Sequence, residues 1–112
     1  MLTLPAIKHE IKNCLGNEPS IAHIIIFGSY VNKSIHEDSD IDLVVILKEK
    51  GIESTYRQRM ERTIRISKLL NPLRKYIAID ILVYTKDEWL YLIKKDSHFL
   101  KEIDKKGSYL HD

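Results

Sequence analysis

The sequence has one cysteine, no long hydrophobic run and little net charge. Because Cys14 is alone among 112 residues, an internal disulfide is excluded. No stretch approaches the roughly 18 apolar residues that a membrane-spanning helix needs. The first residues also lack the basic-then-apolar layout of a signal peptide. We therefore expect a cytoplasmic protein without a membrane partner.

The charge balance narrows the class of function further. The chain carries 18 Lys and Arg residues against 16 Asp and Glu residues, a formal net charge of +2. This balance argues against a protein that binds nucleic acid non-specifically. His9, His98 and His111 lack the spacing of a zinc site. Without repeats or low-complexity segments, residues 1–112 are expected to form one domain.

The most informative stretch runs from Ile24 to Leu47, where two apolar segments flank a polar connection. Both segments have the length and β-branched content of buried strands. The first segment ends at Gly28-Ser29, a turn whose N–H groups and hydroxyl suit phosphate oxygens. The second segment begins with Asp40 and Asp42, which share one face because side chains alternate along a strand.

Two carboxylates on one strand face repel each other and resist burial unless a cation neutralises them. The oxygen-only ligands Asp40 and Asp42 favour a hard divalent ion, Mg²⁺ or Mn²⁺. The stretch therefore predicts a metal site on the second strand.

A third strand is predicted from Tyr76 to Tyr84, and Asp80 is its only charged residue. A carboxylate buried in mid-strand is costly, so Asp80 needs a partner or a changed protonation state. Taken alone, this pattern fits a structural aspartate as well as a functional one. Beside the Asp40 and Asp42 pair, we interpret Asp80 as a third carboxylate of the same site.

Helical periodicity surrounds these strands. We expect a first helix from about Leu4 to Leu15, a long one from about Ser54 to Leu70, one beginning at Lys86 and a short one from Asp96 to Asp104. The fold class is α/β: a small mixed sheet of three core strands, with or without a short fourth, packed by helices. The apolar side of the long helix comprises Tyr56, Met60, Ile64, Ser67 and Leu70.

A Gly-Ser turn, a connection of about ten residues and an Asp-x-Asp strand resemble the signature of the nucleotidyltransferase superfamily that includes DNA polymerase β. The chain is most similar to its smallest members, the minimal nucleotidyltransferases. The sequence Val31-Asn32-Lys33 departs from the small–basic–glycine run usual in that family, and we expect Lys33 to supply the basic contact. The matching residues are Gly28, Ser29, Ser39, Asp40, Ile41, Asp42 and Leu43.

The resemblance implies a polymerase β-like fold and a metal-dependent transfer of a nucleotide. It makes Asp40, Asp42 and Asp80 the catalytic carboxylates, which hold two Mg²⁺ ions. ATP is the implied substrate. Its phosphates would be bound by Gly28, Ser29, Lys33 and Ser39.

Minimal nucleotidyltransferases often pair with a HEPN-domain toxin. The resemblance therefore implies an antitoxin that transfers AMP to a hydroxyl of a HEPN partner. One alternative is a non-catalytic antitoxin that neutralises the partner by contact. A further alternative is an aminoglycoside-type transferase whose pocket a homodimer completes, because 112 residues leave no room for an acceptor domain.

Overall fold

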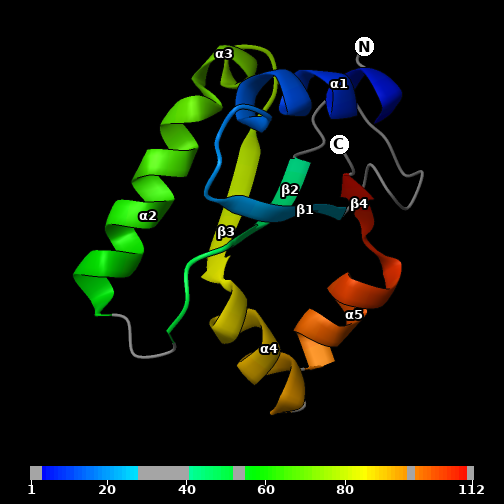
Figure 1. Ribbon diagram of the computed structural model, residues 1–112. Coiled ribbons are helices and arrows are strands. Elements are labelled where there is room, and N and C mark those ends of the chain that lie inside the picture. Colours follow the sequence, from blue (N-terminus) through cyan, green and yellow to red (C-terminus); the bar gives the residue numbers. More distant parts are fainter. Residues whose placement is uncertain (1–3, 28–40, 52–54, 96–97, 111–112) are drawn as a thin grey trace.

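The structure, a computed structural model, describes residues 4–27, 41–51, 55–95 and 98–110 (Figure 1). Helices and strands follow one another in the order expected for an α/β protein. They are α1 (Leu4–Leu15), β1 (Ile21–Phe27), β2 (Ile41–Leu47), α2 (Tyr56–Leu69), α3 (Asn71–Arg74), β3 (Ile79–Thr85), α4 (Lys86–Lys94), α5 (His98–Lys106) and β4 (Ser108–Leu110).

The strands form one mixed sheet in the order β3-β2-β1-β4. β1 pairs with β2 and with β4 in the antiparallel sense, whereas β2 and β3 are parallel. Parallel neighbours need a crossover connection, and here α2 and α3 supply it. The expected mixed sheet is thus confirmed, with β4 as the short fourth strand.

Side chains alternate between two cores, one on each face of the sheet. On one face, Ile24, Leu43 and Ile79 pack with residues of α1, α2 and α3. On the other face, Ile25 and Val44 pack with residues of α4 and α5. Figure 1 shows the same division, with α1 and α3 above the sheet, α2 beside it, and α4 and α5 below. β2 is buried at six of its seven positions, as expected for a central strand covered on both faces.

The third strand begins later than the sequence predicted. The predicted start, Tyr76, lies in a turn after α3 and is 80% exposed. Pro72 explains the shift, because it occupies the first turn of α3, where proline is tolerated, and so adds a short helix before the strand. The Tyr76 N–H donates to the carbonyl of Leu73 at 3.0 Å and not to a neighbouring strand.

Of the apolar side that the sequence pattern indicated for α2, only the last residue, Leu70, is fully buried. Its contact with the core is made by Ile66, which is fully buried, together with Leu69 and Leu70 at its C-terminal end. Tyr56, by contrast, is 71% exposed. Met60 and Ile64 are exposed as well. The helix therefore has two apolar sides, and only one of them is covered by the described residues.

Gly51, which follows β2, is hydrogen-bonded to the start of α4. The Thr85 side chain caps α4 by accepting from the Glu88 N–H at 3.0 Å, and the Glu88 carboxylate accepts from the Thr85 N–H at 2.8 Å. The Thr85 hydroxyl also donates to the Gly51 carbonyl at 2.8 Å. The Gly51 N–H in turn donates to Asp87 at 2.8 Å. Gly51 has φ +113°, a conformation that glycine adopts without strain.

None of the helices in the described ranges combines the length and the apolar character required to cross a lipid bilayer.

Candidate functional site

Strand pairing brings two of the three candidate carboxylates together. In the parallel ladder between β2 and β3, Asp42 is the register partner of Asp80. Register partners on adjacent strands lie about 4.8 Å apart and project from the same face of the sheet. The ladder continues at its start, where the Ile41 N–H donates to the Ala78 carbonyl at 2.9 Å. The two aspartates are thus neighbours although they are 38 positions apart in the sequence.

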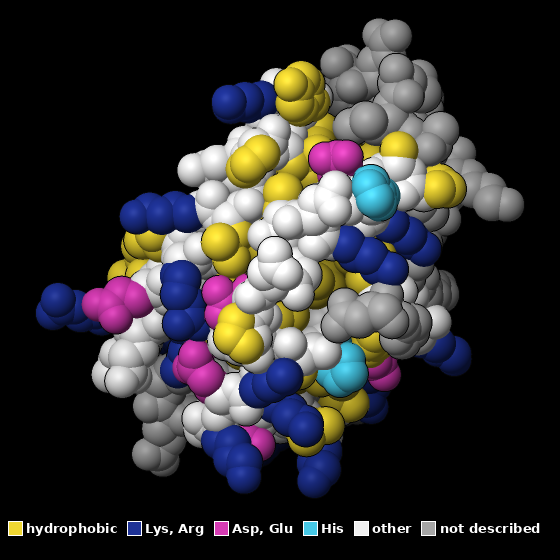
Figure 2. All heavy atoms as spheres, turned by 45° about the horizontal axis from the view of Figure 1, so that its top comes forward, with side chains coloured by type: hydrophobic (Ala, Val, Ile, Leu, Met, Phe, Trp, Pro, Cys, Tyr) yellow, Lys and Arg dark blue, Asp and Glu magenta, His cyan; other side chains and the backbone are white. Residues whose placement is uncertain are grey.

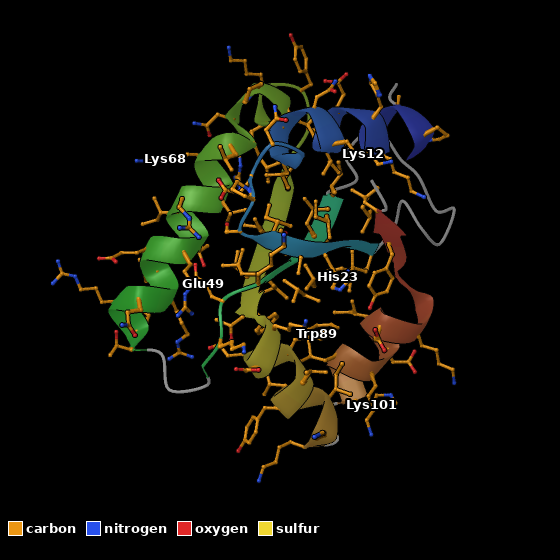
Figure 3. All side chains as sticks on the ribbon, viewed as in Figure 1. Lys12, His23, Glu49, Lys68, Trp89 and Lys101 are labelled. Carbon is orange, nitrogen blue, oxygen red and sulfur yellow. The ribbon has the colours of Figure 1, made fainter. Side chains whose placement is uncertain are left out.

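Both carboxylates belong to the face that α4 and α5 cover only in part. Side chains alternate along β2, so Ile41 and Leu43 point into the core formed with α1, α2 and α3, and Asp42 lies on the opposite face with Val44. Trp89 of α4 packs on this face near the other end of the strands, where its ring lies 5.9 Å from that of Tyr84 (Figure 3). The carboxylates therefore lie at the end of the sheet that is away from α4.

Asp80 is exposed, and the expectation of a buried mid-strand carboxylate was wrong. It is the second residue of β3, a strand at the edge of the sheet. In the described part of the chain, no acidic-basic pair includes Asp80. Exposure removes the desolvation cost that burial would impose, and it leaves the carboxylate accessible to a ligand. Asp42 is half-buried and has an interaction partner of its own.

The other predicted site residues lie outside the described residues: Gly28, Ser29, Lys33, Ser39 and Asp40. Phe27, which precedes Gly28 in the chain, is the register partner of Asp42 on β1. The end of β1 therefore lies directly beside Asp42.

The carboxylate oxygens of Asp42 and Asp80 are suitable ligands for a divalent cation. Adjacent carboxylates on one sheet face form an oxygen-only donor set, which hard cations prefer. Within the described ranges, no cluster of three or more His, Cys, Asp or Glu side chains is arranged to hold a metal ion. The described pair supplies two donors, and a complete site requires a third group such as Asp40.

Two apolar residues that the sequence analysis did not single out border the carboxylates. Leu82 follows Asp80 on the same face of β3 and is 37% exposed, and Phe27 is half-buried next to Asp42. Leu82 could have been found from the strand period, since it stands two residues after Asp80. Phe27 could not, because its place depends on the antiparallel register of β1. Together they give the aspartate pair an apolar border.

Tyr84 ends this row of side chains on β3. Burial, with a smaller contribution from Glu88, raises the pKa of its hydroxyl above the ordinary value. A raised pKa keeps the phenol protonated at neutral pH. Tyr84 packs against the core that α4 and α5 cover.

An ion-pair network occupies the opposite end of β2. Arg62 of α2 lies between Glu49, at 3.2 Å, and Glu88 of α4, at 3.5 Å, and its side chain is only 16% exposed. Figure 3 shows Glu49 on the segment between β2 and α2. A cavity of about 370 Å³ opens beside the network and is lined by Glu49, Gln58, Glu61, Arg62 and Arg65. Because positive and negative groups balance there, the network serves mainly to join α2 to α4.

Comparison with known proteins adds a family and several similar folds. The family model described as Polymerase beta, Nucleotidyltransferase matches residues 9–111. No curated protein matches the sequence significantly.

Three solved structures illustrate the similarity of fold. A toxin–antitoxin crystallised with AMP-PNP has 24% identity and a TM-score of 0.57, over 93% of this chain and 72% of that one. A candidate nucleotidyltransferase from Sulfolobus solfataricus has 19% identity and a TM-score of 0.55, over 92% and 74%. A mutant of the toxin–antitoxin MntA-HpeT has 22% identity and a TM-score of 0.53, over 93% and 71%.

Proposed function

Because the chain belongs to the polymerase β nucleotidyltransferase family, we propose that it transfers AMP from ATP to a hydroxyl of a HEPN-type toxin and so acts as the antitoxin. The observation that carries this proposal is the pairing of Asp42 with Asp80 on one open sheet face. Solved structures with this fold include toxin–antitoxin complexes, one of them crystallised with the ATP analogue AMP-PNP.

Each of the candidate residues has a chemical task in this reaction. Asp42 and Asp80, with Asp40, would hold Mg²⁺, which neutralises triphosphate charge and lowers the pKa of the acceptor hydroxyl when bound. Gly28, Ser29, Lys33 and Ser39 are proposed to bind the phosphates.

The chemistry of the transfer is a displacement at the α-phosphorus. The acceptor oxygen forms a bond to that phosphorus, the bond to the bridging oxygen of the β-phosphate breaks, and pyrophosphate leaves. Asp80 is exposed and can take the proton of the hydroxyl, directly or through water. Leu82 and Phe27 keep part of the reacting group away from solvent.

The direct test uses the toxin encoded by the adjacent reading frame and ATP labelled at the α-phosphate. We expect covalent label on the toxin that requires Mg²⁺ and is lost in Asp42→Asn and in Asp80→Asn. The modified toxin must stay inactive after the antitoxin is removed, because a covalent mark outlasts the contact. Glu10→Gln, an exposed acidic position on α1, is the matched control and should label normally.

A contact-only antitoxin predicts the opposite pattern. In that case both aspartate variants would inhibit the toxin as well as the parent does, and inhibition would end when the two proteins are separated. Full protection by Asp42→Asn without any label would refute the transferase proposal.

A further inference from the structure

The uncovered side of α2 is an interaction surface with a defined chemistry. Tyr56, Met60 and Ile64, here called the α2 stripe, recur every four residues and are 71%, 41% and 46% exposed. Residues spaced in this way form a straight ridge, about 12 Å long at 1.5 Å per residue. The buried side of the same helix is formed by Ile66 and Leu70, so the stripe makes no contribution to that core.

Positive charge borders this stripe on both sides. At 100° per residue, Arg59 flanks it on one side, and Arg57 and Lys68 flank it on the other. Figure 2 shows Lys and Arg side chains beside hydrophobic ones along the left margin, which α2 forms, and Figure 3 shows Lys68 pointing away from the molecule. In the described ranges no acidic group pairs with Arg59 or Lys68.

Among the described residues, the remaining charges of α2 neutralise Arg57 but not Arg59 or Lys68. Arg62 and Arg65 are turned toward Glu49, at 3.2 Å from it in each case. Glu61 is the one acidic residue of the helix, and it pairs with Arg57 at 3.2 Å. The outer side of α2 is therefore an apolar ridge between cations.

We infer that the α2 stripe receives an amphipathic helix of the toxin whose apolar side is bordered by Asp and Glu residues; this inference rests on the proposed function. A ridge of side chains four residues apart packs best into the groove of another helix. Carboxylates on the partner would complement Arg59 and Lys68 and exclude partners of the wrong charge. A second copy of this chain is disfavoured, because pairing α2 with α2 would bring Arg59 and Lys68 of both copies together, while Glu61, the one acidic residue of the helix, already pairs with Arg57.

The stripe is tested by measuring the affinity of the full chain for the toxin of the adjacent reading frame. The double variant Tyr56→Ser/Ile64→Ser should bind at least about tenfold more weakly, because exposed aromatic and aliphatic anchors carry most interface energy. Tyr76→Ser is the matched control, since Tyr76 is 80% exposed but lies outside the stripe. The affinity of this variant for the toxin should stay within about twofold of the parent, as expected for a surface position away from the interface. Equal affinities for the parent and the double variant would overturn the inference, and so would a toxin that does not bind the parent.

Charge and orientation are tested separately. Arg59→Glu/Lys68→Glu should weaken binding and flatten its dependence on salt, whereas Lys12→Glu/Lys94→Glu, at exposed positions on α1 and α4, should not. A photoreactive residue at Met60 should crosslink to a toxin helix rich in Asp and Glu. Crosslinking to a second copy of this chain, or to a basic toxin segment, contradicts the inference.

The outcome is distinguishable from that of the transferase proposal. Asp42→Asn should bind the toxin normally but transfer no label. The stripe variant should have a raised KM for the toxin with an unchanged kcat, because the α2 stripe does not contain the carboxylates. Absence of label together with weakened binding of the stripe variant would refute transfer and leave the docking surface standing.

Discussion

Replacing Asp80 by asparagine should stabilise the metal-free protein. Asp42 and Asp80 are register partners on one face, so their backbones are about 5 Å apart, and we take this spacing as the separation of the charges. At that distance Coulomb's law gives a repulsion of about 0.8 kcal/mol in water and about 3 kcal/mol at an effective dielectric constant of 20. Because Asp80 is exposed, the lower end applies, and we expect a gain of about 1 kcal/mol at low salt.

Urea unfolding at pH 7 measures this gain, in 20 mM and in 1 M NaCl. The Debye length falls to about 3 Å at 1 M salt, so most of the difference between parent and variant should disappear there. Glu10→Gln removes the same charge from an exposed position on α1 and controls for the change in net charge. It should alter the free energy of unfolding by less than about 0.5 kcal/mol.

Divalent metal should reverse the order of stability. A cation that binds only the folded parent raises its free energy of unfolding in proportion to the logarithm of metal concentration. Asp80→Asn lacks one of the proposed ligands and should gain less from Mg²⁺ than the parent does. If Asp80→Asn instead destabilises the metal-free protein by more than about 1 kcal/mol, or if Mg²⁺ stabilises both proteins equally, the interpretation of this pair as a metal site is wrong.

Three further substitutions test the scaffold. Arg62→Ala should lower the free energy of unfolding by about 1–3 kcal/mol, because it leaves the nearly buried Glu88 without its cation. Arg57→Ala is the control, since this side chain is 89% exposed, and it should cost less than about 0.5 kcal/mol. Equal losses for the two variants in urea unfolding would contradict this prediction. Gly107→Ala should cost about 1–3 kcal/mol by calorimetry, because a methyl group there would press on atoms of β1 and α5. Burial and the nearby Asp104 carboxylate raise the pKa of Tyr109 in the folded protein. The stabilisation that the protonated Tyr109 gives to the folded state is therefore complete below about pH 10, the pKa of tyrosine in the unfolded chain, and it is lost as the pH rises beyond that value. Tyr109→Phe should therefore show a shallower loss of stability in alkaline urea titrations than the parent.

The elements could be predicted because their signals are local. Apolar runs bounded by turn residues indicated β1 and β2, and both strands are present in the structure. The helix predicted to begin at Lys86 does so, and it has Asp87 and Glu88 in its first turn. Glu88 also completes the capping box with Thr85, a detail that depends on the residue before the helix.

The orientation of α2 could not be predicted, because two apolar sides compete on the same helix. The predicted side joined Tyr56, Met60 and Ile64, which are exposed, to Leu70, which is buried, and it left the buried Ile66 at its flank. The choice between them depends on Arg62, whose inward position satisfies Glu49 and Glu88, and these acids come from distant parts of the chain. A periodicity argument treats arginine as outward-facing and so selects the wrong side.

For the site, the sequence predicted the residue types but not their environment. The strand period placed Asp80 on one face of its strand, yet its exposure follows from the extent to which α4 and α5 cover that face. The partnership of Asp42 with Asp80 depends on a parallel register, which hydrophobic pattern alone does not determine. The roles of Gly28, Ser29 and Asp40 remain predictions.

One face of the sheet carries the larger hydrophobic core, and the other face carries the candidate carboxylates. The core toward α1, α2 and α3 runs the full length of the strands, from Ile41 to Leu47 on β2, whereas the core toward α4 and α5 begins only at Val44. Asp42 therefore occupies a position where one face is already packed and the other is still open. A carboxylate can be kept there without burial in an apolar core, because Ile41 and Leu43 supply the packing from the opposite face. This arrangement explains how a chain with one modest sheet can carry repelling charges at its edge and still fold, and it requires that substitutions of Asp42 and Asp80 affect transfer far more than stability.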